Sequence, residues 1–486
     1  QTKKLDDEAI REMRDRFGIP VPDDKLHEVP FYKPADDAPE MKYLHERRKQ
    51  LGGYLPQRRR LAEETLSVPP LSAFQPVLDA TAEGREISTT QAYVRTLTVL
   101  LRDATLGPRV VPILVDEART FGMEGFFRQI GIFSQQGQLY EPVDKDQVSY
   151  YREDKAGQIL QEGINEAGAM SSWIAAATSY STNNRVMIPF YIFYSMFGLQ
   201  RIGDLAWAAG DMRARGFLLG GTAGRTTLNG EGLQHEDGHS HVMASTIPNC
   251  IPYDPTFAHE VAVIIQNGLK RMVENQEDVF YYITLMNENY SHPGLKPGQE
   301  ENILKGLYLL QPSSAKKAKL KVQLMGSGTI LREVIAAAEL LEKDWDIAAD
   351  IWSAPSFTLL ARDGQDVERW NLLNPTAKTP RVPYVTQALG SSEGPVIAAT
   401  DYMRTYAEQI RAYLPKGRSY KVLGTDGFGR SDTRAKLREF FEVNRYFVTV
   451  AALKSLADEG SIDASVVAKA VQQYGIDPNK PNPVFQ

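Results

Sequence analysis

The sequence predicts an α/β protein with two domains, each built on a parallel or mixed β-sheet, behind an irregular N-terminal arm. Three observations support this fold class. The chain has 486 residues, which is more than one hydrophobic core usually organises. Short apolar runs alternate with segments of helical periodicity. Between two such sets of segments, residues 291–320 are rich in proline, glycine and lysine, a composition typical of a linker.

The N-terminal part of the chain differs in composition from the rest. Residues 1 to about 85 are polar and proline-rich, with charge runs such as Arg58-Arg-Arg60 and few sustained periodic segments. We interpret this part as an arm or a linker.

A helix is predicted to begin directly after Ser88. Ser88 can cap the helix while Gln91 reaches back, and Ile87 is placed to pack on Ala92. The apolar residues that follow have helical spacing, which indicates burial against a sheet. The next apolar run, residues 110–115, is typical of a strand covered on both faces, and it ends in two carboxylates, Asp116 and Glu117.

The same alternation continues through the first domain. Patterns of period 3.6 predict helices around residues 158–178, 199–213 and 258–272. Runs of β-forming residues predict strands at 186–193, 217–220 and 279–285. The helix around 158–178 would place Glu162 and Glu166 on one face. Tyr194 and Phe197 follow the strand at 186–193, where open α/β sheets place ligand contacts.

The second domain is predicted to be a smaller α/β unit. Its strands are expected at residues 321–325, 347–352, 396–399 and 421–423, with helices between them and right-handed crossovers. Two glycine-rich turns, Gly326-Ser-Gly328 and Gly424 to Ser431, could bind an anion or serve only as tight turns.

Composition excludes several classes of partner. The net charge of −6 shows no basic excess that would attract nucleic acid. The longest mostly apolar run, residues 186–197, is well short of the ~20 residues that a membrane helix requires. The single cysteine, Cys250, fits a reducing compartment, so the cytoplasm is the expected location.

Three of the seven histidines lie within residues 235–241, beside Glu231, Glu236 and Asp237. Their spacing matches no standard zinc signature, so we expect no metal site here. A structural loop with hydrogen-bonded imidazoles is one alternative. General acid/base chemistry or the binding of a substrate anion is the favoured interpretation, because histidine titrates near neutrality.

Six segments together resemble one family over the whole chain. They are Asp116-Glu-Ala-Arg-Thr-Phe-Gly-Met-Glu-Gly125, Ile159-Leu-Gln-Glu-Gly-Ile-Asn-Glu166, Tyr180-Ser-Thr-Asn-Asn184, the run from Thr226 to His241, the run from Ser356 to Trp370 and the run from Gly424 to Asp432. The family is the homodimeric, bacterial-type pyruvate dehydrogenase decarboxylating component, a thiamine diphosphate enzyme related to transketolase. The resemblance implies an arm over residues 1–66, an aminopyrimidine-binding domain over 67–297 and a transketolase-like C-terminal domain over 298–486.

The resemblance also implies roles for individual residues. Glu166 would hydrogen-bond the pyrimidine nitrogen opposite the exocyclic amine, which helps the cofactor to lose its thiazolium C2 proton. Phe197 would stack on the pyrimidine. Tyr194 and His235 would face pyruvate, with Glu231 and Glu117 ordering the same pocket.

The implied activity is oxidative decarboxylation of pyruvate with transfer of the acetyl group to the lipoyl group of dihydrolipoyl acetyltransferase. Members of the family bind Mg²⁺ and the diphosphate through a Gly-Asp-Gly motif in an N-terminal domain, and no Gly-Asp-Gly occurs here. We therefore expect this chain alone to be incomplete. A non-catalytic assembly or dimerisation portion of a split thiamine enzyme is the alternative hypothesis, and a metal-dependent hydrolase is a third.

Overall fold

The structure is a computed structural model that describes residues 5–54, 58–115, 118–143, 151–315 and 317–486. It consists of two compact units, Gln1–Arg58 and Arg59–Gln486. No helix among the described residues is long and apolar enough to cross a membrane.

The first unit contains helices where we expected an irregular arm. Helix α1 spans Asp7–Phe17 and helix α2 spans Pro39–Gln50, with a short 3-10 helix at Asp23–Glu28 between them. The local signals for α1 are its caps: the side chain of Asp6 accepts a hydrogen bond from the backbone of Ala9, and Gly18 ends the helix in the left-handed conformation. Neither helix contains a buried residue, which explains the weak apolar pattern in the sequence.

The second unit contains the helix predicted to begin after Ser88. Helix α4 spans Thr89–Arg102, and the Ser88 side chain accepts a hydrogen bond from the backbone N–H of Gln91, as predicted. Beside it lies a six-stranded, all-parallel sheet in the order β4-β1-β5-β6-β8-β7. Its strands are β1 (Val110–Leu114), β4 (Leu160–Gln161), β5 (Ile188–Tyr194), β6 (Phe217–Gly221), β7 (Cys250–Tyr253) and β8 (Phe280–Thr284).

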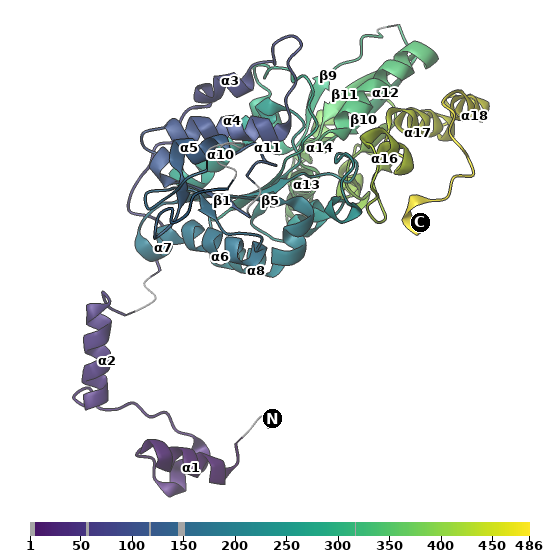
Figure 1. Cartoon of the computed structure of the whole chain (residues 1–486). Helices are drawn as coiled ribbons and strands as arrows, with labels where there is room; N and C mark the ends of the chain where they lie inside the picture. Colours follow the sequence, from purple (N-terminus) through teal and green to yellow (C-terminus); the bar gives the residue numbers. More distant parts are fainter. Residues whose placement is uncertain (1–4, 55–57, 116–117, 144–150, 316) are drawn as a thin grey trace. The chain divides into compact units, whose positions relative to one another are not determined.

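Helices cover both faces of this sheet (Figure 1). Helices α4 and α10 (Ala258–Leu269) pack on one face through a large apolar core. Helices α6 (Glu166–Ala177) and α8 (Leu199–Asp211) pack on the other face, where Trp173 is fully buried. Because both faces are covered, the strands are apolar on both sides, as the sequence predicted.

Two sequence predictions for this domain were wrong. The helix predicted around residues 158–178 begins only at Glu166, because Asn165 caps it and residues 160–161 form the edge strand β4. Glu162 therefore does not share a helical face with Glu166. Strand β7 was not predicted, since its Pro252 and its short length hide the β signal.

The C-terminal domain has a five-stranded mixed sheet in the order β13-β12-β10-β11-β9. Strands β10 (Leu320–Gly326), β11 (Ile347–Ser353), β12 (Val396–Ala399) and β13 (Tyr420–Leu423) are parallel, close to their predicted positions. Strand β9 (Tyr308–Gln311) runs antiparallel to β11 and, with helix α11 (Glu300–Lys305), lies in the segment that we predicted to be a linker.

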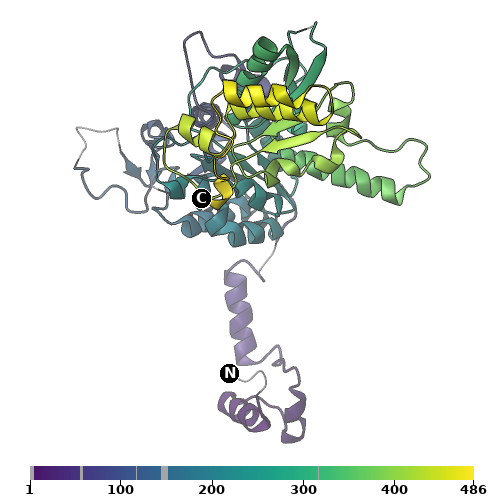
Figure 2. The ribbon, with the colours of Figure 1, turned by 90° about the vertical axis from the view of Figure 1, so that its right-hand side faces the viewer.

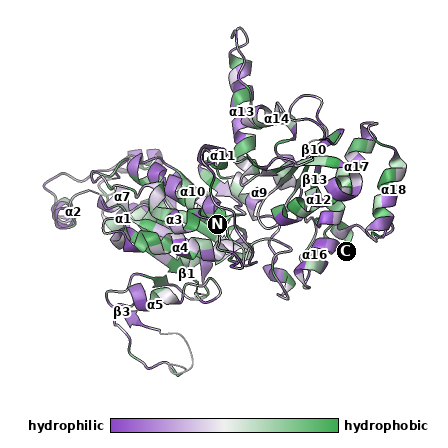
Figure 3. Cartoon of the chain, turned by 90° about the horizontal axis from the view of Figure 1, so that it is seen from above, coloured by the Kyte–Doolittle hydropathy of each residue, from purple (hydrophilic) through white to green (hydrophobic). Residues whose placement is uncertain are grey.

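Helices again cover both faces of the second sheet. Helices α12 (Ile330–Trp345) and α17 (Arg445–Asp458) lie together on one face. Figure 2 shows the yellow helices of the C-terminal part of the chain turned toward the viewer. Helices α13 (Phe357–Leu373) and α14 (Tyr384–Leu389) pack on the other face. Figure 3 shows hydrophilic and hydrophobic residues alternating along α13, as expected of a helix with one buried face.

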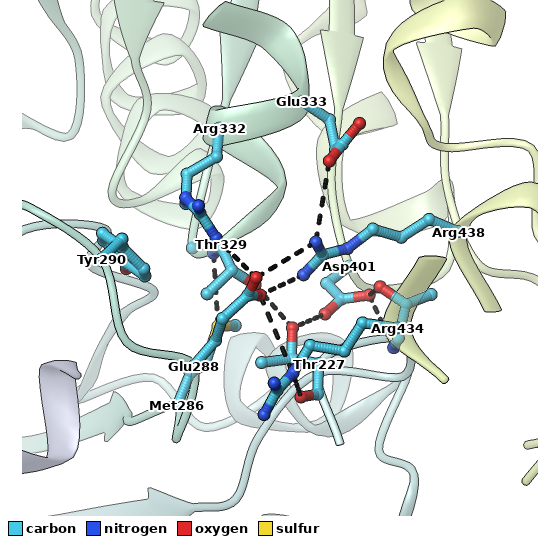
Figure 4. Close-up of polar contacts among 12 residues, drawn as sticks. Thr227, Met286, Glu288, Tyr290, Thr329, Arg332, Glu333, Asp401, Arg434 and Arg438 are labelled. Carbon is cyan, nitrogen blue, oxygen red and sulfur yellow. Dashed lines mark hydrogen bonds and ion pairs between the residues drawn. The ribbon is translucent and has the colours of Figure 1, made fainter. Parts of the chain in front are cut away.

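A polar cluster joins the two domains around Glu288, which follows β8. The guanidinium groups of Arg332, Arg434 and Arg438 are turned toward its carboxylate (Figure 4), and the Arg438 side chain is only 6% exposed. Burial alone would raise the pKa of Glu288, but the hydrogen bonds and charge of Arg438, with the charges of Arg332 and Arg434, hold that pKa below its usual value. Helix α16 (Arg434–Phe440), which carries two of these arginines, is thereby fixed to the first domain.

Candidate active site

Three aromatic side chains meet at the carboxyl end of β5. Tyr194 ends this strand, Phe197 lies in the one-turn 3-10 helix Ser195–Phe197 that follows it, and His235 ends the short 3-10 helix Leu233–His235. The His235 ring centroid lies 5.2 Å from that of Tyr194 and 4.9 Å from that of Phe197, both with the rings edge to face. All three side chains are half-buried. The structure thus brings His235 to the strand end that carries Tyr194 and Phe197.

Glu166 reaches this group through one arginine. Glu166 is the first residue of α6, and the residue is buried, at 8% exposure. The Arg201 guanidinium of α8 donates a hydrogen bond to Glu166 Oε1 across 2.7 Å. The same guanidinium lies over the Phe197 ring, with its carbon 4.2 Å from the ring centroid. Glu166, Arg201 and Phe197 therefore form one continuous surface beside His235.

Two predicted site residues remain, Glu231 and Glu117. Glu231 is exposed in the loop that leads to His235. Glu117 lies outside the described residues. Their roles stay predictions.

The loop that carries His235 is held by the C-terminal domain. The carboxyl oxygen Oε2 of Glu236 accepts a hydrogen bond from the backbone N–H of Arg430 across 2.8 Å. Arg225 donates to the carbonyl of Thr425 across 2.8 Å and also to that of Gly427. The glycine turn from Gly424 to Ser431 contacts this loop directly. We had left open whether this turn binds an anion, and these contacts give it a structural use.

Burial changes the acidity of two groups in this loop. Burial raises the pKa of Glu236 to about 8, against the lowering effect of the Arg430 N–H. Burial lowers the pKa of the His241 imidazole to about 3, so this ring is neutral at pH 7. The Nε2 atom of His241 lies 2.9 Å from the hydroxyl of Thr284, which fits a structural role. His239 lies at the edge of the same loop, with its Nε2 2.9 Å from Gln200 Oε1.

Metal binding finds no support in the described ranges. Within these ranges, no group of three or more histidine, cysteine, aspartate or glutamate side chains could hold a metal ion.

The sequence matches two family models. Residues 73–293 match the pyruvate dehydrogenase E1 component middle domain, and residues 306–444 match the transketolase-like C-terminal domain.

Curated relatives match over the whole chain. The chain is 62% identical to the pyruvate dehydrogenase E1 component of Cupriavidus necator over 484 residues, which cover 100% of this chain and 54% of that protein. Its identity to the E1 component of Pseudomonas aeruginosa is 64%, covering 99% of this chain and 54% of that protein. For the Escherichia coli K12 protein the identity is 57%, with the same coverage. The chain belongs to the pyruvate dehydrogenase E1 family. It spans about half the length of these E1 relatives.

Solved structures share the fold of this E1 chain at low sequence identity. Transketolase from Campylobacter jejuni has a TM-score of 0.57 at 16% identity, covering 92% of this chain and 59% of the transketolase. Transketolase from Leishmania mexicana has a TM-score of 0.58 at 15% identity, covering 94% of this chain and 56% of that protein. These similarities establish a transketolase-like fold, as the sequence analysis predicted.

Sequence analysis missed two features of this E1 site. Arg201 carries no local signal, since an arginine near the start of a helix is ordinarily a solvated side chain. The pairing of Glu236 with Arg430 joins residues 194 positions apart, and nothing in the two short motifs indicates that they are neighbours.

Proposed function

We propose that this chain is the aminopyrimidine-binding and C-terminal part of a thiamine diphosphate-dependent pyruvate dehydrogenase E1. The reaction is oxidative decarboxylation of pyruvate with transfer of the acetyl group to the lipoyl group of dihydrolipoyl acetyltransferase. Membership of the E1 family supports the proposal. The observation that carries it is the placement of Glu166 and Phe197, because one planar group contacts both of them at once.

The residues present fit the aminopyrimidine ring. The Arg201 guanidinium, which is planar and donates hydrogen bonds, already contacts the ring of Phe197 and the carboxylate of Glu166. A protonated pyrimidine ring could use the same two groups, stacking on Phe197 and donating to Glu166. When bound, thiamine diphosphate supplies the carbon nucleophile and the electron sink for decarboxylation of a 2-oxo acid.

In this proposal each side chain has a defined task. Glu166 holds a proton on the pyrimidine nitrogen through its carboxylate, and Phe197 orients the ring. His235 donates a hydrogen bond to the substrate carboxylate, where a fixed donor stabilises developing charge. Tyr194 forms the wall beside His235, at a ring distance of 5.2 Å. Glu231 and Glu117 order the entrance to the same pocket.

The rest of the cofactor site lies in the part of the family that this chain does not match. The family resemblance assigns Mg²⁺ and the diphosphate to a domain with a Gly-Asp-Gly motif, which is absent from this sequence. We further propose domain boundaries at 66/67 and 297/298, assembly as a homodimer, and a cytoplasmic location. The complete enzyme is this chain together with the N-terminal portion of its E1 relatives, fused or co-expressed.

The proposal is tested by release of labelled CO₂ from carboxyl-labelled pyruvate by the complete enzyme. Release should require thiamine diphosphate and Mg²⁺, and Glu166→Gln should lower it by about 100-fold or more, as expected for loss of a general acid/base partner. The matched control is Glu301→Gln, an exposed glutamate paired with Lys305 in α11, which should retain full activity. Absence of release, or full activity of Glu166→Gln, would leave the non-catalytic assembly role as the better account.

A further inference from the structure

One side chain holds the loop that carries His235 against the C-terminal domain. Glu236 follows His235 directly, and its Oε2 accepts a hydrogen bond from the backbone N–H of Arg430 across 2.8 Å. The two segments pack closely, because a Cβ atom at Gly429 would lie 3.0 Å from the Cβ of Glu236. Glu236 itself is only 1% exposed. The backbone position of His235 therefore depends on the state of this buried carboxyl group.

The hydrogen bonds around Glu236 suit a neutral carboxyl group. Its Oε1 is buried and has no hydrogen-bond partner among the described residues. The guanidinium of Arg225 donates to the backbone carbonyl of Glu236 and to two carbonyls of the glycine turn from Gly424 to Ser431. A buried carboxylate is costly unless several donors replace the water that it loses, whereas a protonated carboxyl group carries no charge. The donors present therefore favour the protonated form.

The charged groups that face Glu236 from other elements have opposing effects on its acidity. Burial is the largest influence and raises the pKa of Glu236 to about 8. The backbone N–H of Arg430 lowers that pKa, as does the positive charge of Arg225, which follows β6, whereas the negative charge of Asp401, which follows β12, raises it. Its neighbour Asp237 accepts hydrogen bonds within its own loop. The carboxyl group of Glu236 therefore stays neutral up to mildly alkaline pH.

We propose that Glu236 is a positioning residue: its neutral carboxyl group fixes the loop of His235 to the glycine turn, and its ionisation releases this loop. This inference rests on the proposed function, which gives His235 its contact with the substrate. Once ionised, Glu236 places a second negative charge beside Asp401 and lacks a second donor, so the side chain turns toward water. The loop moves with it, and His235 leaves its place beside Tyr194 and Phe197.

The size of the expected effect follows from the fraction of enzyme in which Glu236 is neutral. This fraction is about nine tenths at pH 7 and about one tenth at pH 9. In the unmodified enzyme, release of the loop should therefore lower kcat/KM for pyruvate by about 10-fold between these two pH values. Glutamine has the shape of a protonated glutamate and does not ionise. Glu236→Gln should thus match the unmodified enzyme at pH 7 and keep its loop in place at pH 9.

The test is kcat/KM for pyruvate of the complete enzyme with thiamine diphosphate and Mg²⁺, measured from pH 7 to 9. The ratio of Glu236→Gln to the unmodified enzyme should be near one at pH 7 and about 10 at pH 9. The matched control is Glu301→Gln, an exposed glutamate paired with Lys305, for which this ratio should not change with pH. A constant ratio for Glu236→Gln, or a large loss of its activity at pH 7, would overturn the proposal.

A second readout follows the loop itself and does not depend on activity. Hydrogen–deuterium exchange with peptide mass spectrometry measures the protection of residues 231–240 and of the glycine turn. After correction for the intrinsic effect of pH on exchange, both segments should lose protection between pH 7 and 9 in the unmodified enzyme and keep it in Glu236→Gln. Unchanged protection in the unmodified enzyme would overturn the proposal even if Glu236→Gln did not fold.

The two readouts also separate this inference from the proposed function. If the complete enzyme does not decarboxylate pyruvate at any pH, the proposed function fails. The exchange measurement still decides in that case whether ionisation of Glu236 releases the loop.

Discussion

A carboxyl oxygen of Glu236 accepts a hydrogen bond from the backbone N–H of Arg430, although the two residues belong to different domains. Glu236 directly follows His235, so this contact ties the proposed catalytic histidine to the C-terminal domain. Gly429 adjoins the same contact, since a Cβ atom there would lie 3.0 Å from the Cβ of Glu236. The C-terminal domain therefore positions the site without providing its aromatic or acidic groups.

Replacing Glu236 by glutamine should change how stability depends on pH. The folded protein keeps a proton on Glu236 up to a pKa of about 8, whereas an unfolded glutamate releases it near its usual value of 4.5. Raising the pH from about 5 to 8 therefore favours the unfolded state of the unmodified protein, and glutamine removes this loss. The thermal midpoint of Glu236→Gln should rise relative to the unmodified protein by an amount that grows over this range, equivalent to about 4–5 kcal/mol at pH 8.5.

The control for this experiment is Glu231→Gln, an exposed glutamate in the same loop. The thermal midpoint of Glu231→Gln should change with pH in the same way as that of the unmodified protein. If the Glu236→Gln difference were constant from pH 5 to 8.5, the buried carboxyl group would not titrate in this range.

Gly429→Ala should weaken the contact between the C-terminal domain and the loop that carries His235. The new Cβ would lie 2.3 Å from the carbonyl oxygen of Leu233 and 3.0 Å from the Cβ of Glu236. Overpacking of this kind costs about 1–3 kcal/mol, which a lower thermal midpoint would report. Gly125→Ala is the matched control, since no atom lies within 4 Å of its Cβ position, and it should change stability by less than about 0.5 kcal/mol. Equal midpoints for the two variants would contradict the close approach at Gly429.

Glu288→Gln should strongly destabilise the junction between the domains. It would leave Arg438, whose side chain is 6% exposed, with Glu333 at 3.6 Å as its remaining ion-pair partner, and it would remove the charge that Arg332 and Arg434 face there. Removing one partner of a buried ion pair costs about 3 kcal/mol or more. Denaturant unfolding would measure the loss. Glu301→Gln, which breaks the exposed pair with Lys305, should cost less than about 1 kcal/mol. A loss no larger than that of the control would show that the arginines find other partners.

His235→Ala in the complete enzyme should impair catalysis while it leaves cofactor binding largely unchanged. In the proposed function the imidazole donates a hydrogen bond to the substrate carboxylate, so its loss should lower kcat/KM for pyruvate by about 100-fold. The dissociation constant of thiamine diphosphate should change far less. Steady-state kinetics and calorimetry measure the two quantities. His239→Ala removes an imidazole that contacts Gln200 instead, and it should retain most of the activity. A comparable loss in both variants would mean that the whole loop, and not the His235 side chain, is responsible.

Local patterns in the sequence predicted much of the fold because they act over a few residues. Ser88 caps α4 through the predicted hydrogen bond to Gln91. The predicted start of α6 was wrong because the capping residue, Asn165, lies inside a segment whose apolar spacing continues toward the N-terminus. Strand β9 was missed because its position depends on pairing with β11, which follows it by more than thirty residues. A strand at a sheet edge is selected by its neighbour as much as by its own residues.

The sequence by itself determined the α/β class, the order of most strands and helices, the family motifs that contain Glu166 and His235, and the strand end that carries Tyr194 and Phe197. Only the tertiary structure decided which of these groups meet, and that Arg201 joins two of them. The physical reason is the distance along the chain over which each interaction acts. Capping, periodicity and turn chemistry are encoded in neighbouring residues, whereas contacts across domains depend on how the whole chain packs.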